Sequence, residues 1–184
     1  STYYQIAPKG IQVTDQVMGT PQARALVAEL QTGGSTAAQA SKAARDLIAT
    51  GATLIEPTAA AGGSTLFKVV ARGEPVSEMS PYWMTAAQAQ VVSKMSTEQA
   101  ANFLGLPLAQ RLAAQQAGGF NFYTISARQT STVFQSTIAP TVERNISHVG
   151  GGSQVLVPNR SSWTPAVRVD PRHPSTFLPR PPGG

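Results

Sequence analysis

The chain has 184 residues and a mass of 19.2 kDa, which is enough to bury one good core. Apolar residues make up 41% of it and charged residues only 12%, a balance that excludes the highly charged kind of disorder. Because cysteine is absent, disulfides and thiolate zinc sites are excluded as well. No apolar run approaches the roughly 20 residues that span a bilayer, and the lack of a starting methionine indicates a piece of a longer protein.

The charge is distributed unevenly along the chain. Residues 1–100 hold seven basic and seven acidic side chains and are therefore neutral. Residues 101–184 hold seven arginines, no lysine, and only Glu143 and Asp170 as acids, so the whole formal excess of +5 lies there. Guanidinium groups suit phosphate, and this asymmetry favours a polyanionic partner. A basic protein with no nucleic-acid role fits the charge equally well.

Helices are predicted in the first third of the chain. Thr20 and Pro21 supply an N-cap and a first-turn proline for one helix. Thr36 and Gln39 form a capping box that opens a second helix. The apolar face of this second helix consists mostly of alanine, so it needs a partner surface. We expect residues 1–63 to be a helical leader or linker segment outside the active core.

Strands and further helices alternate in the middle of the chain. Strand signals begin at 52–56 and are clearer at 65–71, with a loose alanine and glycine stretch at 59–63 between them. Two helices with capping boxes of their own follow, and a short third helix precedes a glycine pair. These three helices are predicted to begin after Thr85, after Ser96 and at Leu108.

After residue 118 the apolar pattern changes from helical to alternating. Four short strands are predicted, at 120–126, 132–137, 154–157 and 166–169. Their short connections favour antiparallel pairing, whereas the connection 139–152 is long. The order predicts an α+β fold, in which N-terminal helices are followed by a small twisted antiparallel sheet of about four strands. The catalytic domain is expected at residues 64–184, with a proline-rich tail from Pro171.

The acids are too few for most nuclease chemistry. Metal-dependent nucleases need two or three converging carboxylates, and only Glu143 and Asp170 follow residue 100. The chain also lacks a P-loop, a dinucleotide-binding glycine turn and a nucleophile elbow. We therefore expect neither a metal nor a cofactor. Metal-free cleavage of RNA by its own 2′-hydroxyl remains, and it needs an imidazole or carboxylate for proton transfer and cations or hydroxyls for charge.

The long connection 139–152 carries the residues best suited to that chemistry. His148 is the candidate general base or acid because imidazole titrates near neutral pH, and Glu143 is its candidate partner. The remaining catalytic candidates are Arg128, Ser136 and Thr137, and the candidate substrate-binding residues are Arg144, Arg160, Lys68 and Trp163. Each has a plain structural alternative: an exposed loop residue, an ion pair, an edge-strand hydroxyl or, for Trp163, core packing.

Five stretches of the sequence resemble the C-terminal toxin domains of contact-dependent growth inhibition effectors and related polymorphic toxins. They are SPYWMTAAQAQ (80–90), STEQAANFLGLP (96–107), FNFYTIS (120–126), VFQSTIAPT (133–141) and GGGSQVLVPN (150–159). The resemblance covers residues 64–170. It implies a metal-independent RNA endonuclease of the barnase/EndoU/colicin/RelE-like group, with tRNA as its substrate.

The same resemblance implies partners and a route of delivery. A cognate immunity protein, acidic where it covers a basic cleft, would neutralise the toxin. The domain would travel as the C-terminal part of a larger secreted or cell-surface effector and act in the cytoplasm of a neighbouring bacterium. The helical leader, residues 1–63, would then belong at least partly to the segment that helps entry into that cytoplasm, although the usual junction motif between delivery segment and toxin is missing. A requirement for a host protein cofactor stays open.

A second resemblance points to another enzyme class. TLFKVVARGEP (65–75), followed by YWMT, is similar to the opening strand of ADP-ribosyltransferase-type toxins, in which an early basic residue meets NAD. Lys68 or Arg72 would be that residue. Such folds also use a Ser-Thr-Ser element and a late glutamate, whereas this chain has a Thr-Ser-Thr at 130–132 and no glutamate beyond Glu143. A basic interaction module without enzymatic activity is the third alternative.

Overall fold

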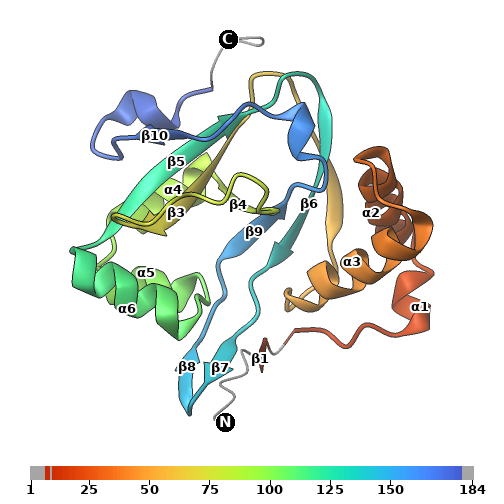
Figure 1. Ribbon diagram of the computed structural model, residues 1–184, viewed down its shortest axis with the longest axis horizontal. Helices are drawn as coiled ribbons and strands as arrows, with labels where there is room; N and C mark the ends of the chain where they lie inside the picture. Colours follow the sequence, from red (N-terminus) through yellow and green to blue (C-terminus); the bar gives the residue numbers. More distant parts are fainter. Residues whose placement is uncertain (1–6, 9, 180–184) are drawn as a thin grey trace.

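The computed structural model describes residues 7–8 and 10–179 (Figure 1). The helices are α1 Asp15–Met18, α2 Pro21–Thr32, α3 Ala37–Ala49, α4 Ala86–Ser93, α5 Thr97–Phe103 and α6 Leu108–Ala117, with the 3-10 helices η1 Arg160–Ser162 and η2 Pro174–Phe177. The strands are β1 Ala7–Pro8, β2 Glu56–Ala60, β3 Thr65–Ala71, β4 Tyr82–Thr85, β5 Phe120–Ser126, β6 Ser131–Thr137, β7 Thr141–Glu143, β8 Ile146–His148, β9 Ser153–Leu156 and β10 Val167–Val169. No helix in this described part is long and apolar enough to cross a membrane.

Seven of the strands form one antiparallel sheet in the order β10-β5-β3-β4-β9-β6-β2, and β1, β7 and β8 form a small second sheet. Helices α1–α3 lie beside β2 and β6, whereas α4–α6 lie beside β3 (Figure 1). The predicted α+β class is confirmed. The large sheet exceeds the predicted four strands because β2, β3 and β4, which precede α4 in the chain, join the four strands that follow α6.

The strand predictions differ in quality along the chain. The four strands predicted after residue 118 are confirmed as β5, β6, β9 and β10, and the strand predicted at 65–71 is β3. The strand predicted at 52–56 is wrong, because β2 begins where that prediction ends. β2 lies at Glu56–Ala60 since these five residues pair with β6, running into the alanine stretch that was expected to be loose. Strand β4 was not predicted.

Side-chain caps start the helices largely as predicted. Thr20 caps α2, and the capping boxes of Thr36 at α3 and Ser96 at α5 are complete. Thr85 caps α4 by accepting a 3.2 Å hydrogen bond from the backbone N–H of Gln88. The side chain of Gln88 does not return to Thr85 and bonds Ser153 of β9 instead, so this predicted capping box is half formed and ties α4 to the sheet.

The long connection predicted at 139–152 contains a β-hairpin. Strands β7 and β8 pair through Thr141–Glu143 and Ile146–His148. Arg144 and Asn145 form the turn, with φ of 51° and 64°. Positive φ at both central residues is typical of the tight turn that suits the twist of a hairpin. The long connection therefore contains two short strands that the sequence did not predict.

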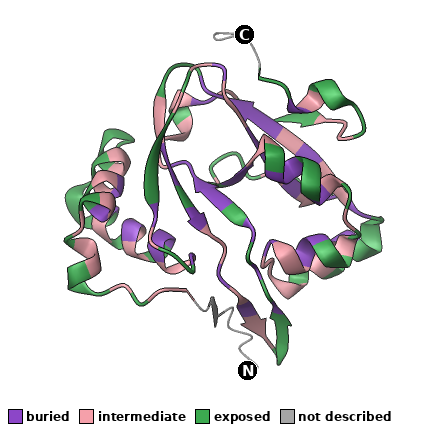
Figure 2. Cartoon of the chain, turned by 180° about the vertical axis from the view of Figure 1, so that it is seen from behind, coloured by how far each residue is buried: buried purple, intermediate pink, exposed green. Residues whose placement is uncertain are grey.

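Buried residues, purple in Figure 2, lie along the strands of the large sheet and on the helices beside it. Among the described residues, their side chains form three hydrophobic clusters. Phe67 of β3 packs with α4, α5 and β5 in one cluster. In another, Leu26 of α2 and Ile48 of α3 pack on Phe134 of β6 and Leu156 of β9, and all four are fully buried. Each such side chain contributes about 1.5–3 kcal/mol through burial. The predicted leader thus packs on the sheet, while a separate function for it stays a prediction.

Candidate functional site

The two halves of the large sheet diverge beside β3. Strand β4 pairs with β3 only through Leu66 and Phe67, and its other end pairs with β9 through Tyr82 and Trp83. From Lys68 onward, the edge of β3 on this side therefore has no strand partner among the described residues. Because the strands separate here, space opens between them that side chains do not fill.

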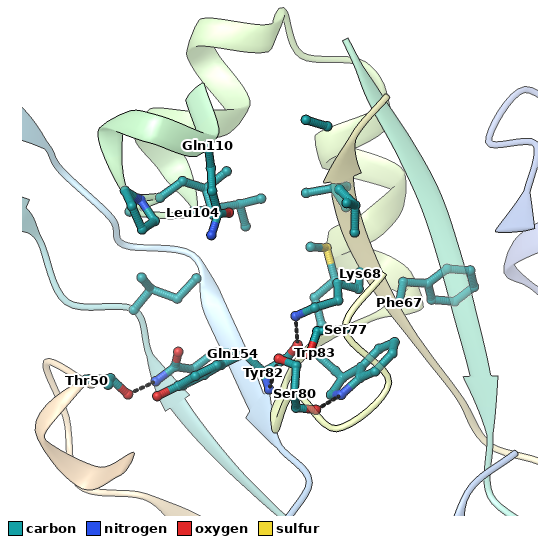
Figure 3. A pocket seen from close by; sticks show the side chains of 18 of the residues that line it. Thr50, Phe67, Lys68, Ser77, Ser80, Tyr82, Trp83, Leu104, Gln110 and Gln154 are labelled. Carbon is teal, nitrogen blue, oxygen red and sulfur yellow. Dashed lines mark hydrogen bonds between the residues drawn. The ribbon is translucent and has the colours of Figure 1, made fainter. Parts of the chain in front are cut away.

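A cleft of about 700 Å³ occupies this divergence (Figure 3). Its walls come from β3, β4, β9, the β3–β4 loop, the α5–α6 loop and the first turns of α6. The polar side chains that line it are those of Thr50, Lys68, Glu74, Ser77, Ser80, Tyr82, Gln88, Gln110, Thr141, Ser153 and Gln154. A cleft of this size suits a ligand as large as a nucleotide, for which mostly apolar walls with a few polar groups are typical.

Lys68 supplies the cation of the cleft. Its Nζ donates a 2.6 Å hydrogen bond to the backbone carbonyl of Tyr82 and lies 5.2 Å from the centre of the Trp83 ring (Figure 3). It forms no ion pair with any carboxylate in the described part of the chain. Loss of water on burial lowers the pKa of Lys68 from 10.5 to about 8. An anion bound in the cleft would supply the missing opposite charge.

Gln154 on β9 is held with its amide toward the cleft. Its Nε2 donates to the hydroxyl of Thr50 at 3.0 Å (Figure 3). It also donates to the hydroxyl of Ser136 at 3.1 Å. The amide oxygen has no hydrogen-bond partner among the described residues, yet it is not sealed from solvent. Beside it, burial raises the pKa of Tyr82, so its phenol stays neutral near pH 7. Both side chains therefore offer uncharged hydrogen-bonding groups to a ligand.

The β3–β4 loop forms one rim of the cleft and is anchored by Arg160. The Nε of Arg160 donates to the backbone carbonyl of Glu78 at 2.7 Å, and its Nη2 lies 3.4 Å from the Glu78 carboxylate. That carboxylate also accepts from the backbone N–H of Ala166 at 2.9 Å. The guanidinium lies 5.2 Å from the ring of Trp83. Arg160, a predicted substrate ligand, thus contacts the loop and Trp83 and does not line the cleft.

The α5–α6 loop forms the opposite rim and is held by the β7–β8 hairpin. The hydroxyl of Thr141 donates to the carbonyl of Gly105 at 2.8 Å. The carboxylate of Glu143 accepts from the backbone N–H of Leu108 at 2.6 Å, where α6 begins without a cap of its own. A negative charge at this position also suits the helix dipole. Glu143 therefore fixes the start of a helix that lines the cleft.

His148 lies behind this rim and is 3% exposed. Its Nδ1 bonds the carbonyl of Leu106, and its Nε2 lies 3.2 Å from Nη1 of Arg111. A carbonyl only accepts and a guanidinium only donates, so the two contacts fit the tautomer that carries its proton on Nδ1. The imidazole therefore lies beside a guanidinium, as the RNase hypothesis requires, but both ring nitrogens are engaged within the protein. Its catalytic role stays a prediction.

The remaining predicted residues do not line the cleft. Arg128 donates from Nε to the carbonyl of Trp163 at 3.3 Å, and Trp163 is buried in a core cluster. Thr137 ends β6, where its backbone N–H donates to Thr53. Arg144 lies in the hairpin turn. Of the predicted set, the structure brings Lys68 into the cleft, places Ser136 against Gln154, and places Glu143 and His148 behind the α5–α6 rim.

Gln154, Thr50 and Gln88 were not among the predicted residues. Each is an uncharged side chain in an ordinary strand or helix pattern, so no local signal marked it. Lys68 was marked by the resemblance of its strand to ADP-ribosyltransferase-type toxins.

No protein-family model and no curated protein sequence matches the chain. Among the solved structures that are similar to it are two complexes of a protein with its partner. One is described as Rhs1-CT in complex with the cognate immunity protein RhsI1, with 14% identity and a TM-score of 0.42 over 67% of this chain and 83% of that chain. The other is described as Tse6 in complex with Tsi6, with 15% identity and a TM-score of 0.43 over 79% of this chain and 93% of that chain. Neither likeness identifies the activity of this chain.

Proposed function

We propose that the chain is a bacterial toxin domain whose cleft binds NAD and breaks the bond between ribose and nicotinamide. The toxin part rests on the sequence resemblance to polymorphic toxins. The chemistry rests on one observation: the ammonium of Lys68, which forms no ion pair among the described residues, lies in a cleft of about 700 Å³ where the sheet divides. Lys68 is one of the two residues, with Arg72, that the resemblance to ADP-ribosyltransferase-type toxins offered as the early basic residue that meets NAD.

The side chains that line the cleft suit a dinucleotide better than a nucleic-acid strand. Lys68 offers one positive charge to a pyrophosphate, and apolar walls suit the flat faces of the two bases. Gln154 and Tyr82 offer neutral groups to ribose hydroxyls. None of the candidate RNA-binding arginines lines this cleft. An RNA strand, by contrast, needs several cations along its backbone.

The reaction requires little of the protein besides positioning. The bond between ribose C1′ and the nicotinamide nitrogen breaks, and neutral nicotinamide leaves with the bonding electrons. Positive charge develops on the ribose until water or an acceptor side chain bonds to C1′ and loses a proton. The amide oxygen of Gln154 would steady that charge by accepting a hydrogen bond from a ribose hydroxyl. ADP-ribosyltransferase-type folds use a late glutamate here, whereas the late strand of this cleft carries a glutamine.

Release of nicotinamide from NAD by the purified domain tests the proposal. We expect turnover that Lys68→Ala reduces by at least about 100-fold, because an anion contact in a partly desolvated site is lost. Lys94→Ala, at the C-terminal end of α4 and outside the cleft, is the matched control and should retain full turnover. If calorimetry detects no binding of NAD to the wild-type domain, the proposal is wrong.

Metal-independent cleavage of RNA, with tRNA as the expected substrate, is the second candidate. The observation that favours it is the contact between His148 and Arg111, because a paired imidazole and guanidinium are what that chemistry requires. Incubation of the domain with total tRNA in EDTA tests it. Intact tRNA, or cleavage that stops on chelation, would contradict it. Full cleavage by His148→Ala would show that this residue takes no part in the mechanism, while the assignment as a metal-independent ribonuclease would still hold.

We further propose that a cognate immunity protein neutralises the domain and that a larger effector delivers it into a competing bacterium. Both proposals rest on the sequence resemblance. Expression of the domain in a bacterial cytoplasm should arrest growth, and Lys68→Ala should relieve the arrest without reducing the amount of folded protein. Growth arrest that persists in this variant would show that toxicity does not depend on Lys68 in the cleft.

A further inference from the structure

A second concavity, of about 890 Å³, lies at the far end of β3 and β5. Its walls are the α4–α5 connection, the start of β5, and the segment from β10 to residue 172. It shares no lining residue with the cleft that contains Lys68. We call it the basic groove, because the guanidinium-bearing residues Arg72, Arg168 and Arg172 all line it.

The three arginines of the basic groove differ in the partners of their guanidinium groups. Arg172 is held by Asp170, with Nη2 at 2.8 Å and Nε at 3.0 Å from the carboxylate oxygens. These hydrogen bonds hold the pKa of Asp170 well below its usual range, so the pair stays ionised. The guanidinium groups of Arg72 and Arg168 make no hydrogen bond or ion pair with any residue that the structure describes. With Asp170 as its one lining carboxylate, the groove carries an excess of two positive charges.

An open strand edge borders the groove. Strand β10 is the last strand of the large sheet and pairs only with β5 among the described residues. Its first residue, Val167, is 47% exposed, and its last, Val169, lines the groove. The outer edge of such a strand presents unpaired backbone N–H and C=O groups, to which an extended peptide can add as a further strand.

We propose that the basic groove and the outer edge of β10 together bind an extended acidic segment of a partner protein. The backbone of the segment would pair with β10, and its carboxylates would meet Arg72 and Arg168 in charge-assisted hydrogen bonds. This binding site is independent of the proposed reaction with NAD, because none of its residues lines the cleft.

The lining favours a polypeptide over a nucleic acid. Single-stranded nucleic acids are held by stacking of bases on exposed aromatic rings. The aromatic residues of the groove, Phe120 and Phe122, belong to the hydrophobic core around Phe67 and are not free to stack. Strand pairing, moreover, is available only to a peptide backbone.

Fluorescence anisotropy with a fluorescein-labelled oligoglutamate peptide tests the proposal on the whole chain. We expect the double variant Arg72→Glu/Arg168→Glu to bind the peptide at least about tenfold more weakly than the wild type. Arg24→Glu is the matched control, because Arg24 is exposed on α2 and outside the groove. Its affinity should lie within about twofold of the wild type. Hydrogen exchange at the amides of Val167–Val169 should slow when the peptide binds.

The remaining outcomes would overturn the proposal. They are equal binding by the double variant, absence of binding by the wild type, and unchanged exchange along β10 in the bound state. Preferential binding of an oligouridylate RNA over the peptide would identify a nucleic-acid surface instead. Because Arg72 and Arg168 are exposed, the double variant should keep its fold. The milder Arg72→Gln/Arg168→Gln variant repeats the measurement if circular dichroism shows otherwise.

Discussion

At the scale of single residues, Lys68 determines how the cleft responds to pH. Its pKa is lowered to about 8 by burial, so the ammonium is mostly charged at pH 7 and mostly neutral at pH 9. A bound anion favours the charged form. The affinity for NAD should therefore fall as pH rises through about 8, by roughly tenfold per pH unit at the alkaline end if charge alone binds the ligand.

Calorimetric dissociation constants for NAD between pH 6.5 and 9.5 measure this dependence. The control is Lys68→Arg, because a guanidinium stays charged across the whole range and should give a flat profile. A flat profile for the wild type as well would show that Lys68 does not meet the anion.

Gln154 is expected to act on the reaction more than on binding. Replacement by alanine removes the amide oxygen that faces the developing charge and leaves the Thr50 and Ser136 hydroxyls in place. We expect kcat for NAD cleavage to fall by about 100-fold, with a small change in KM, as for the loss of one oriented donor or acceptor. Gln110→Ala is the control, because Gln110 lines the cleft from α6 and is exposed. A rise in KM alone would assign Gln154 to binding.

At the scale of elements, local sequence patterns predicted those helix starts and strands that depend on residues close together in the chain. The caps at Thr20, Thr36 and Ser96 depend on residues three apart, and the alternation in β5 extends over seven residues. Strands β4, β7 and β8 have only three or four residues each, too few to show a period. Their formation depends on pairing with distant segments, as does the position of β2.

The cleft could not have been predicted from the sequence for the same reason. It exists because β4 leaves β3 after two paired residues and joins β9, which follows it by about seventy residues in the chain. The resemblance of the β3 sequence to ADP-ribosyltransferase-type toxins marked Lys68. No local pattern connected Lys68 with Gln154. Gln154 and its two hydrogen-bond partners, Thr50 and Ser136, come from three separate parts of the chain.

His148 helps to anchor the α5–α6 loop, so its replacement should lower the stability of the fold. Alanine at this position removes the bonds to Leu106 and Arg111. It leaves the half-buried guanidinium of Arg111 without a hydrogen-bond partner among the described residues, since its buried Nε already lacks one. We expect the free energy of unfolding to fall by about 2–3 kcal/mol, as for a buried polar network that loses one member. Urea denaturation measures it. The control is His173→Ala on the exposed tail, which should change stability by less than about 0.5 kcal/mol.

At the scale of the whole molecule, the helices before β2 and the sheet share one core. Leu26 and Ile48 are fully buried against Phe134 and Leu156, so the segment expected to be a leader covers one face of β6 and β9. Because the buried surface is shared, the two parts should unfold together. Leu26→Ala should then lower the stability of the entire chain by about 2–4 kcal/mol and preserve a single transition.

Calorimetry combined with tryptophan fluorescence distinguishes shared from separate unfolding. Trp83 and Trp163 both lie in the cluster between β4, β5, β6 and β9, far along the chain from Leu26, so their emission reports on the sheet alone. In the Leu26→Ala variant, the fluorescence midpoint should move together with the helical signal in circular dichroism. If only the helical signal moved, the first three helices would be a separate unit, and their role as a leader would gain support over their role as part of the cleft-bearing fold.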